Sequence, residues 1–324
     1  MQVIESLDSI SKFDQETVLT FGTFDGVHIG HRAIIKEVVA QAQKLGWEHE
    51  APAEVGARGS CRSVVLSFDP HPMYFLSPKE CPPILTTKAK KIELLKEMGV
   101  DIAIFAKLEE QIAELPAIDF VEQILVQQLR VKSVVVGYDC NFGRDRTGDI
   151  DLLESLGWEH NFTVRVIIPQ KFCGVVVSST RIRKAIAQND LELARHLLGG
   201  RYSIRGEVIK GQGIGKEIGF PTANIDAGNQ MLPPPGIYVI RAKLNNKMFG
   251  GVLNMGVRPT FGDNQFQIEA HLLGFDAPAY GHTVEIFFIE KIRDEKVFSR
   301  VEELIDQINS DIEKAMKILA FEID

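Results

Sequence analysis

The chain has little cysteine, no excess of positive charge and no long apolar run. Its four cysteines, Cys61, Cys81, Cys140 and Cys173, lie far apart without a Cys-x-x-Cys pair, which fits a reducing compartment and provides no zinc framework. The formal charge of −8 excludes a general basic field that would attract nucleic acid or an anionic membrane. No stretch approaches the roughly 20 apolar residues of a membrane span, and the first residues lack a signal-peptide pattern. We therefore expect a cytoplasmic protein with no nucleic-acid or membrane partner, in which local groups hold any small anionic ligand.

The composition that is present is ordinary for a globular protein, and 324 residues predict about two domains. In the first half, short β-branched runs alternate with helical patterns at 31–46, 87–99 and 117–129. The runs span 17–21, 63–68, 101–105, 133–137 and 163–168. Each is nearly continuous in apolar character, as strands buried on both faces are. The alternation predicts a Rossmann-like α/β domain with a parallel sheet, whose ligands lie beyond the carboxyl ends of the strands.

The pattern changes after two short helical segments that end near Gly199. Strand-like runs then follow one another without a helix between them, at 202–210, 236–244, 247–255, 266–275 and 282–290. Asn245 and Asn246 separate two of these runs as a hairpin turn, because asparagine tolerates positive φ. We expect an antiparallel β-barrel closed by an amphipathic helix over 297–319. The domains are placed at 1–186 and 187–324, and the polar segment 47–62 is expected to be a surface loop.

The stretch TFGTFDGVHIGHR follows the first expected strand. Gly22 and Gly26 permit close backbone approach, and Gly30 lets the chain turn into a helix. The N–H groups and dipole of that helix favour an anion, and His28 and His31 can donate to phosphate oxygens. Both histidines could instead cap or pack. Zinc is disfavoured, because zinc-binding helices usually space histidines at i and i+4 with a third ligand.

This stretch resembles the GxFDGxHxGH signature of the nucleotidylyltransferases, in the form found in FMN adenylyltransferases of the bacterial FAD synthetase family. Further blocks resemble the same family in the same order: LSFDPHP, LTTKAKKIELL, VVGYDCNFGRDRTGD and VSSTRIRKAI. The family often has an aromatic residue where this chain has Cys140. The segment 47–62 resembles an insertion relative to the family.

The resemblance implies roles for several residues of the first half. His28 and His31 would hold the ATP phosphates and stabilise charge in the transition state. Asp69, Pro70 and His71 would lie near the flavin phosphate. The other residues implied in nucleotide or flavin binding are Gly22, Phe24, Asp25, Gly30, Asp139 and Asn141, with Ser179, Thr180 and Arg183 on the outer phosphates.

A second constellation lies in IKGQGIGKEIGFPTANID, where alternating glycines precede Thr222 and Asn224. Glycine spacing alone leaves open a phosphate-covering loop or a mobile hairpin. Further on, Gln267, Glu269 and His271 alternate with apolar residues, so their side chains share one face of the strand. That face either lines a cleft or is exposed to solvent.

Both segments resemble the glycine loop, PTAN motif and ExHL strand of riboflavin kinases. The resemblance implies that Thr222 and Asn224 hold Mg²⁺ and ATP phosphate, which suits the oxygen preference of this ion. It implies that Glu269 is the general base for the ribityl 5′-hydroxyl. The remaining residues implied in binding are Gly211, Gly213, Gly215, Lys216, Phe220 and Arg293, the last in a segment that borders the flavin.

Together the halves resemble the bifunctional bacterial riboflavin kinase/FMN adenylyltransferase family over almost the whole chain. This implies that riboflavin and ATP give FMN at the barrel, and that FMN and a second ATP give FAD and pyrophosphate at the α/β domain, with Mg²⁺ serving both steps. Two alternatives remain: an adenylyltransferase for a pantetheine or nicotinate nucleotide with a passive barrel, and a non-catalytic flavin-binding regulator. A homo-oligomer and transfer of FMN between sites are left open.

Overall fold

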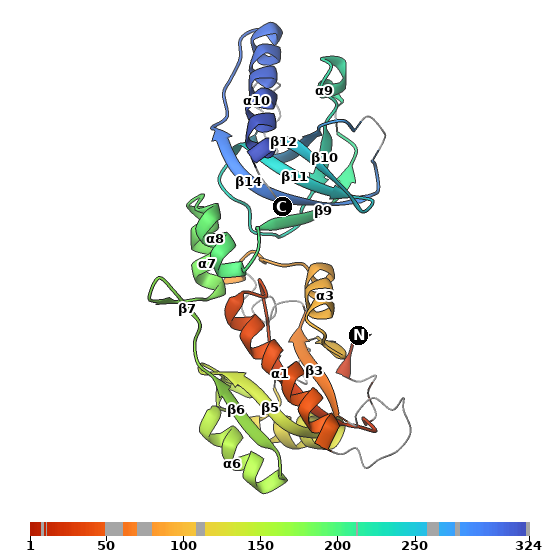
Figure 1. The fold of residues 1–324 in the computed structure, drawn as a ribbon, viewed down its shortest axis with the longest axis vertical. Coiled ribbons are helices and arrows are strands. Elements are labelled where there is room, and N and C mark those ends of the chain that lie inside the picture. The colour runs from red at the N-terminus through yellow and green to blue at the C-terminus, as the bar shows by residue number, and fades with distance from the viewer. Residues whose placement is uncertain are drawn as a thin grey trace. The chain divides into compact units, whose positions relative to one another are not determined.

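The computed structural model describes residues 1–7, 10, 12–48, 61–69, 80–107, 114–211, 213–257, 266–275 and 279–321 (Figure 1). The chain divides into two compact units, Met1–Ser178 and Ser179–Asp324. The expected domain boundary after residue 186 falls inside the first helix of the second unit and stays a prediction. Residues 49–60 of the expected 47–62 loop, together with Pro70 and His71, lie outside the described residues. The expected bounds of this loop were wrong at both ends, because a helix continues to Glu48 and a strand begins at Cys61.

The first unit contains a six-stranded parallel sheet with the order β1-β4-β3-β2-β5-β6. Its strands are β1 (Gln2–Ile4), β2 (Glu16–Gly22), β3 (Cys61–Phe68), β4 (Ile102–Ala106), β5 (Val131–Gly137) and β6 (Thr163–Ile167). The predicted parallel sheet is confirmed, and each of the five expected runs forms a strand. The short edge strand β1 was not predicted, because three residues form too short a run to stand out.

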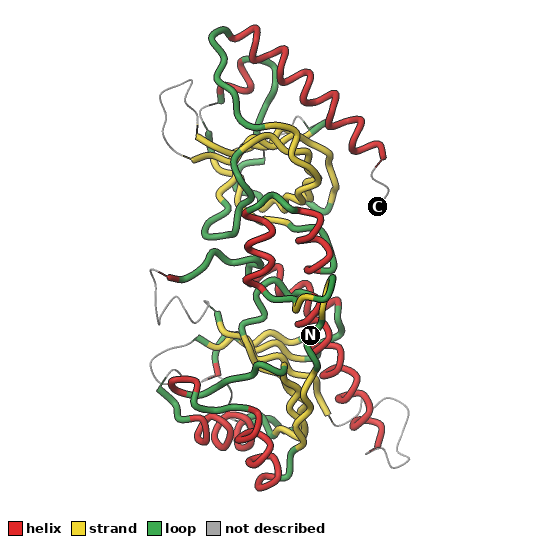
Figure 2. The backbone as a smooth tube through the Cα atoms, turned by 90° about the vertical axis from the view of Figure 1, so that its left-hand side faces the viewer, coloured by secondary structure: helices red, strands yellow, loops and turns green. Residues whose placement is uncertain are grey.

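Helices connect these strands and cover both faces of the sheet (Figures 1 and 2). They are α1 (Ile29–Glu48), α3 (Lys88–Glu97), α5 (Ala117–Asp119), the π-helix η3 (Phe120–Gln128), the 3₁₀ turn η4 (Arg144–Arg146) and α6 (Ile150–His160). A small hairpin, β7 (Lys171–Phe172) with β8 (Val175–Val176), completes the unit. The three helical patterns predicted from sequence are confirmed, while α6 was not singled out.

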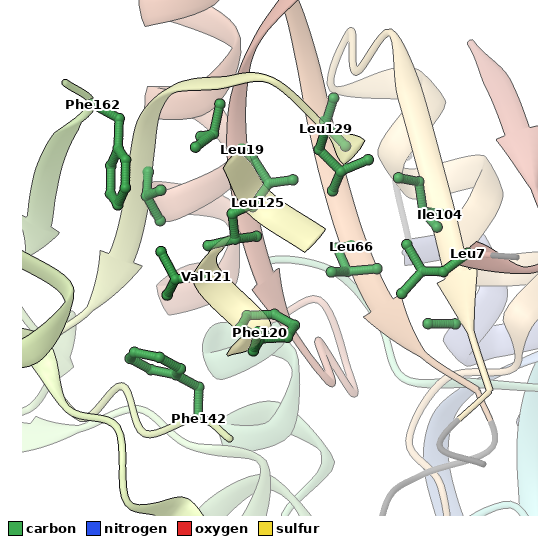
Figure 3. Close-up of a cluster of buried hydrophobic side chains, with 14 of the residues drawn as sticks. Leu7, Leu19, Leu66, Ile104, Phe120, Val121, Leu125, Leu129, Phe142 and Phe162 are labelled. Carbon is green, nitrogen blue, oxygen red and sulfur yellow. The ribbon is translucent and has the colours of Figure 1, made fainter. Parts of the chain in front are cut away.

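Buried apolar side chains on each face of the sheet explain the continuous apolar runs. On one face, Leu19 and Leu66 pack with Phe120 and Leu125 of η3 (Figure 3). The opposite face packs against α1 and α3. Strands buried on both sides bring apolar residues to every position rather than to alternate ones.

The strand order reverses at β2, and this reversal positions the first candidate site. From β2 the chain builds β3 and β4 on one side and then returns to place β5 and β6 on the other. In open α/β sheets, ligands bind outside the carboxyl ends of the strands at such a point. The segments that leave β2 after Gly22 and β5 after Gly137 both emerge there.

The second unit contains a closed antiparallel barrel with the order β10-β13-β12-β11-β14-β9 (Figure 2). Its strands are β9 (Ser203–Ile209), β10 (Ala223–Asp226), β11 (Gly236–Leu244), β12 (Lys247–Val257), β13 (Phe266–Leu272) and β14 (Thr283–Arg293). The predicted barrel is confirmed, and Asn245 and Asn246 form the expected hairpin turn with φ of 51° and 62°. The short strand β10, which follows a proline, was not predicted.

Four helices accompany the barrel among the described residues: α7 (Ser179–Ala187), α8 (Leu191–Leu198), α9 (Ile214–Glu217) and α10 (Val301–Phe321). The predicted amphipathic helix is α10, which packs on β11 and β12 and buries Ala315 completely. Gly250 of β12 allows this packing, since a Cβ there would lie 2.6 Å from a methyl carbon of Leu319.

Candidate active sites

The turn after β2 has a strained backbone. Val27 N–H donates to the Phe24 carbonyl across 3.2 Å, which closes the turn. Phe24 and Val27 have φ of 47° and 39°, a region that non-glycine residues rarely adopt, while Gly26 at 88° adopts its value without cost. Strain of this kind concentrates at functional sites, where the surrounding structure holds it in place.

Asp25 holds this turn to the segment that precedes α3. The side chain is 4% exposed, and its carboxylate accepts from the backbone N–H groups of Leu85 at 3.0 Å and Thr86 at 3.1 Å. Phe24 is also buried, and its ring lies edge-on to His31 with centroids 5.2 Å apart. These contacts make both residues structural parts of the site, and direct contact with a ligand stays a prediction for each.

His28 and His31 lie with their rings stacked at the mouth of α1, with centroids 3.6 Å apart. The His31 backbone N–H lies 3.2 Å from His28 Nδ1 and donates to it. Gly30 leaves room for this arrangement, because a Cβ there would lie 3.1 Å from the His28 ring. The two histidines predicted from sequence therefore lie together at the first turn of the 20-residue helix α1. The N–H groups of that turn favour an anion.

Burial keeps both imidazoles neutral at neutral pH. It lowers the pKa of His28 to about 4. The pKa of His31 is well below its usual value, chiefly because of burial and also because of repulsion from the protonated form of His28 and from the Lys91 ammonium group. Since His28 Nδ1 accepts a hydrogen bond, neutral His28 carries its proton on Nε2 and can donate it to a phosphate oxygen. His31 Nδ1 is buried without a partner among the described residues.

The turn after β5 brings Asp139 to the same edge of the sheet. A Cβ on Gly137 would lie 3.2 Å from the Asp139 carboxylate and 3.4 Å from Ile34 of α1, so this carboxylate lies beside the helix that carries His31. Asn141 Nδ2 donates to the Asp139 carbonyl at 2.9 Å, and both side chains are exposed. Cys140 packs against the apolar cluster, and burial raises the pKa of its thiol to about 12, so it remains a protonated, largely apolar group.

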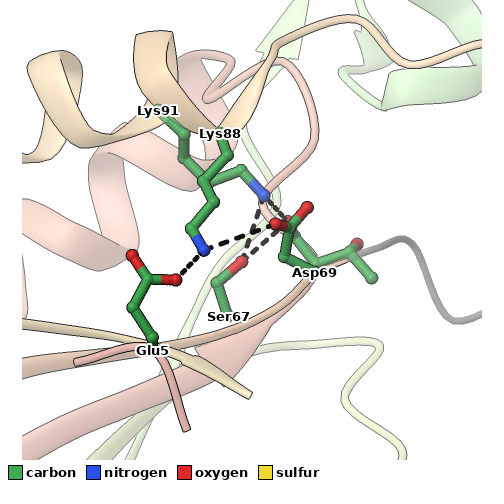
Figure 4. A network of polar contacts seen from close by, with 6 residues as sticks. Glu5, Ser67, Asp69, Lys88 and Lys91 are labelled. Carbon is green, nitrogen blue, oxygen red and sulfur yellow. Dashed lines mark hydrogen bonds and ion pairs between the residues drawn. The ribbon is translucent and has the colours of Figure 1, made fainter. Parts of the chain in front are cut away.

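The other predicted residues of the first site occupy two places. Asp69 follows β3 at the carboxyl edge of the sheet, where its carboxylate lies 3.7 Å from Lys88 Nζ (Figure 4). Ser179, Thr180 and Arg183 lie in α7, which begins the second unit. Their expected contact with phosphates at the first site therefore joins two units and stays a prediction.

A cavity of about 180 Å³ in the barrel unit contains most of the second predicted site. Its lining includes the predicted residues Gly215, Phe220, Thr222, Glu269 and Arg293. Apolar side chains of α10, among them Ile308, form part of its wall. The cavity thus combines an apolar surface suited to an aromatic ring with polar groups from the PTAN segment and β13.

Strand register places two asparagines next to Glu269, and one of them, Asn254, lines the cavity with it. Asn224 of β10 lies directly opposite Glu269 of β13, and Asn254 of β12 lies opposite Glu269 on its other side. Side chains at directly opposed positions project to the same face of the sheet. Glu269 is 7% exposed, so its carboxylate is sheltered, with Asn254 beside it in the cavity lining and Asn224 on the neighbouring strand β10.

The glycine loop passes very close to the PTAN segment. A Cβ on Gly211 would lie 2.0 Å from Asn224 Nδ2, and one on Gly215 would lie 2.5 Å from the Phe220 carbonyl and 3.1 Å from Thr222 Oγ1. At Gly215 a Cβ would meet backbone, so glycine is required there for steric reasons, whereas at Gly211 a Cβ would displace the Asn224 side-chain amide. Gly213 has a φ of 79°, and Lys216 lies in the short helix α9, which sequence analysis did not predict within this loop.

Arg293 is positioned by Asp311, a cavity residue that sequence analysis missed. Its Nε and Nη2 donate to the Asp311 carboxylate at 3.1, 3.0 and 2.7 Å, while Nη1 donates to the Asp294 carbonyl at 2.9 Å. Asp311 is 2% exposed. A signal was available, because Asp311 lies on the apolar stripe of α10 between Ile308 and Ala315, where a charge is unexpected.

Asn254 is a second cavity residue without a specific sequence prediction. Its Oδ1 is buried and has no hydrogen-bond partner among the described residues. Since buried polar atoms are normally paired, this oxygen is available to a ligand in the cavity.

Thr222 and Asn224 suit Mg²⁺ only in combination with a phosphate ligand. The described residues contain no group of three or more histidine, cysteine or acidic side chains that could hold a metal. A hydroxyl and an amide oxygen are hard donors of the kind Mg²⁺ takes, with phosphate and water completing its shell. The residues present therefore fit this ion when ATP is bound.

None of the helices in the described part of the chain is long and apolar enough to cross a membrane.

Comparison with known proteins identifies both units. The family model described as FAD synthetase matches residues 10–181, and the model described as riboflavin kinase matches residues 198–319. A bifunctional riboflavin kinase/FMN adenylyltransferase of Escherichia coli strain K12 is 37% identical over 315 residues, covering 96% of each chain. The corresponding protein of Haemophilus influenzae is 37% identical over 318 residues, covering 97% of this chain and 98% of that one.

A solved structure has a similar fold over nearly all of the chain. A crystal structure described as a macrolide-efflux protein from Streptococcus pneumoniae aligns with a TM-score of 0.79 at 26% identity, covering 97% of this chain and 98% of that one. The full-length relatives and the two adjoining family models agree on one assignment. The chain belongs to the bifunctional riboflavin kinase/FMN adenylyltransferase family, with an FAD synthetase domain followed by a riboflavin kinase domain.

Proposed function

We propose that the two reactions of this family are divided between the two units, each at the site described above. The barrel cavity phosphorylates riboflavin with ATP to give FMN. The mouth of α1 then adenylylates FMN with a second ATP to give FAD and pyrophosphate. The observation that carries the proposal is that each unit has its own phosphate-suited site, one with stacked neutral histidines and one with Thr222 and Glu269 around a single cavity.

In the barrel, Glu269 takes the proton of the ribityl 5′-hydroxyl as that oxygen attacks the γ-phosphorus of ATP. The new oxygen–phosphorus bond gives FMN, and ADP leaves with the electrons of the broken bond. The sheltered position of Glu269 beside Asn224 supports this role. Thr222 and Asn224 would hold Mg²⁺, which neutralises phosphate charge when bound. The glycine loop lies close enough to Asn224 to cover the phosphates.

In the α/β unit, a phosphate oxygen of FMN attacks the α-phosphorus of ATP, and pyrophosphate leaves. Charge develops on the phosphate oxygens in this step. His28 Nε2–H and the first N–H groups of α1 donate to these oxygens, so that stabilisation increases as the charge grows. Because both imidazoles are neutral before ATP binds, the phosphates themselves favour their protonation in the complex.

This proposal is tested by measuring the formation of FMN and of FAD by the same purified protein. Purified protein is incubated with riboflavin, ATP and Mg²⁺, and the flavins are separated over time. We expect FMN to form first and FAD to follow. FMN without FAD would indicate an inactive first unit, and no conversion would favour the regulator left open by the sequence.

Single substitutions assign each step to a unit. His31→Ala is expected to stop FAD formation and spare FMN formation. Glu269→Ala is expected to stop FMN formation and spare FAD formation when FMN is supplied. Losses in the opposite units would overturn the assignment. The match of residues 198–319 to riboflavin kinases already disfavours a passive barrel, while Mg²⁺ as the ion, cytoplasmic location and self-association stay predictions.

A further inference from the structure

A buried lysine lies beneath the strained turn of the first unit, and neither proposed reaction uses it. Lys91 of α3 is 6% exposed. Its Nζ donates to the Thr23 carbonyl at 2.6 Å. It also donates to Ser67 Oγ at 3.1 Å (Figure 4). Ser67 Oγ in turn donates to the same Thr23 carbonyl at 3.2 Å. One ammonium group thus joins the end of β2 to the end of β3.

Burial of the Lys91 ammonium group disfavours its charged form, which suggests that this charge has a functional role. Burial lowers the pKa of Lys91, while the charges of Asp25 and Asp69 raise it. The two hydrogen-bond acceptors are a carbonyl and a hydroxyl, neither of them charged. A buried ammonium group is unfavourable without close compensation, and such groups are found disproportionately at functional sites.

Two tethers from the same region hold the strained turn. Lys91 holds Thr23, the residue before Phe24, whose φ is 47°. The backbone N–H groups of Leu85 and Thr86, just before α3, hold Asp25. Lys91 is also close enough to His31 for its charge to lower the pKa of that imidazole. The turn that leads into His28 and His31 is therefore fixed on both sides of its first strained residue.

We propose that Lys91 is a positioning residue for adenylyl transfer: its ammonium group fixes the Thr23 carbonyl and the Ser67 hydroxyl, and through them the turn that presents His28 and His31. This rests on the proposed FAD-forming site at the mouth of α1. Lys91 acts through the turn and makes no contact with the reacting atoms in the role proposed here. A misplacement of catalytic groups by about 1 Å can reduce a rate roughly 100-fold.

The test compares Lys91→Met, which keeps the length of the side chain without its charge, with Lys96→Met on the exposed side of the same helix. Lys91→Met is expected to lower kcat for FAD formation about 10- to 100-fold, with the KM for ATP changed less than about 3-fold. FMN formation by the same chains measures active protein and is expected to be unchanged. Lys96→Met is expected to match the parent chain in both reactions.

A spectroscopic measurement separates positioning from loss of fold. The ¹⁵N resonance of His28 Nδ1 reports its hydrogen bond from His31 N–H and is expected to move in Lys91→Met but not in Lys96→Met. If Lys91→Met unfolds the first unit, Ser67→Ala tests the proposal in its place. We expect Ser67→Ala to lower kcat for FAD formation by a smaller factor and to move the His28 resonance in the same direction.

The proposal is overturned if folded Lys91→Met keeps its kcat, if the His28 resonance does not move, or if the loss is in KM, which would indicate a substrate ligand. Unchanged kcat in Ser67→Ala, where that variant decides, also overturns it. Failure of the proposed function is distinguishable, since His31→Ala would then retain FAD formation.

Discussion

Replacing Asp311 with leucine leaves Arg293 buried without its partner, and the barrel unit should lose much of its stability. The Arg293 and Asp311 side chains are 13% and 3% exposed, and three N···O distances between 2.7 and 3.1 Å join them. Removing one member of such a pair costs about 3–5 kcal/mol, because the other charge stays desolvated and unpaired. The pair joins β14 to α10, so the wall of the cavity loosens as well.

Denaturant unfolding of the barrel unit, followed through riboflavin kinase activity and circular dichroism, measures this loss. Glu303→Gln is the matched control on the same helix, since the exposed pair of Glu303 with Arg300 contributes at most about 0.5 kcal/mol. The double variant Arg293→Met with Asp311→Leu is expected to recover most of the loss, because a shape-matched apolar pair carries no desolvation penalty. A loss below about 1 kcal/mol in Asp311→Leu, or a double variant as unstable as the single one, would refute the reasoning.

Three further predictions use other contacts. Because burial lowers the pKa of His28 from 6.5 to about 4, the unfolded chain binds a proton at this side chain at a higher pH than the folded chain does. The melting temperature of the α/β unit should therefore decrease as the pH is lowered from 6.5 to 4, and it should decrease less in His28→Asn. Gly211→Ala places a Cβ 2.0 Å from Asn224 Nδ2 and should abolish FMN formation while sparing FAD formation from FMN, whereas Gly200→Ala, with open space around it, should preserve both; equal activities would contradict the close approach. Asn254→Leu removes the unpartnered oxygen and should raise the KM for riboflavin about 10-fold, and an unchanged KM would contradict a ligand contact there.

The distribution of apolar and turn-forming residues along the sequence was sufficient to predict the fold of both halves. Continuous apolar runs predicted the parallel strands, and Asn245–Asn246 predicted the hairpin, because these signals depend only on neighbouring residues. The strands β1 and β10 were not predicted because the local pattern is weak in both. They contain only three and four residues, and a proline precedes β10, so neither run shows a clear strand pattern.

The candidate sites were predictable as segments but not as networks. Family-like motifs located His28 and Glu269, yet their surroundings depend on residues far away in sequence. Asp25 binds the backbone at Leu85, and Arg293 binds Asp311 on another element. No local spacing reveals such partners. The buried Asp311 and Lys91 do leave a trace, because each is a charged residue on the apolar stripe of its helix.

Counting nucleotide sites tests the central claim most directly. Titration of the intact protein with a non-hydrolysable ATP analogue and Mg²⁺ is expected to find two sites per chain. The double variant His28→Ala with His31→Ala should lose one of them, and Thr222→Ala with Asn224→Ala should lose the other. A single site in the parent chain, or one variant that removes both sites, would contradict the account.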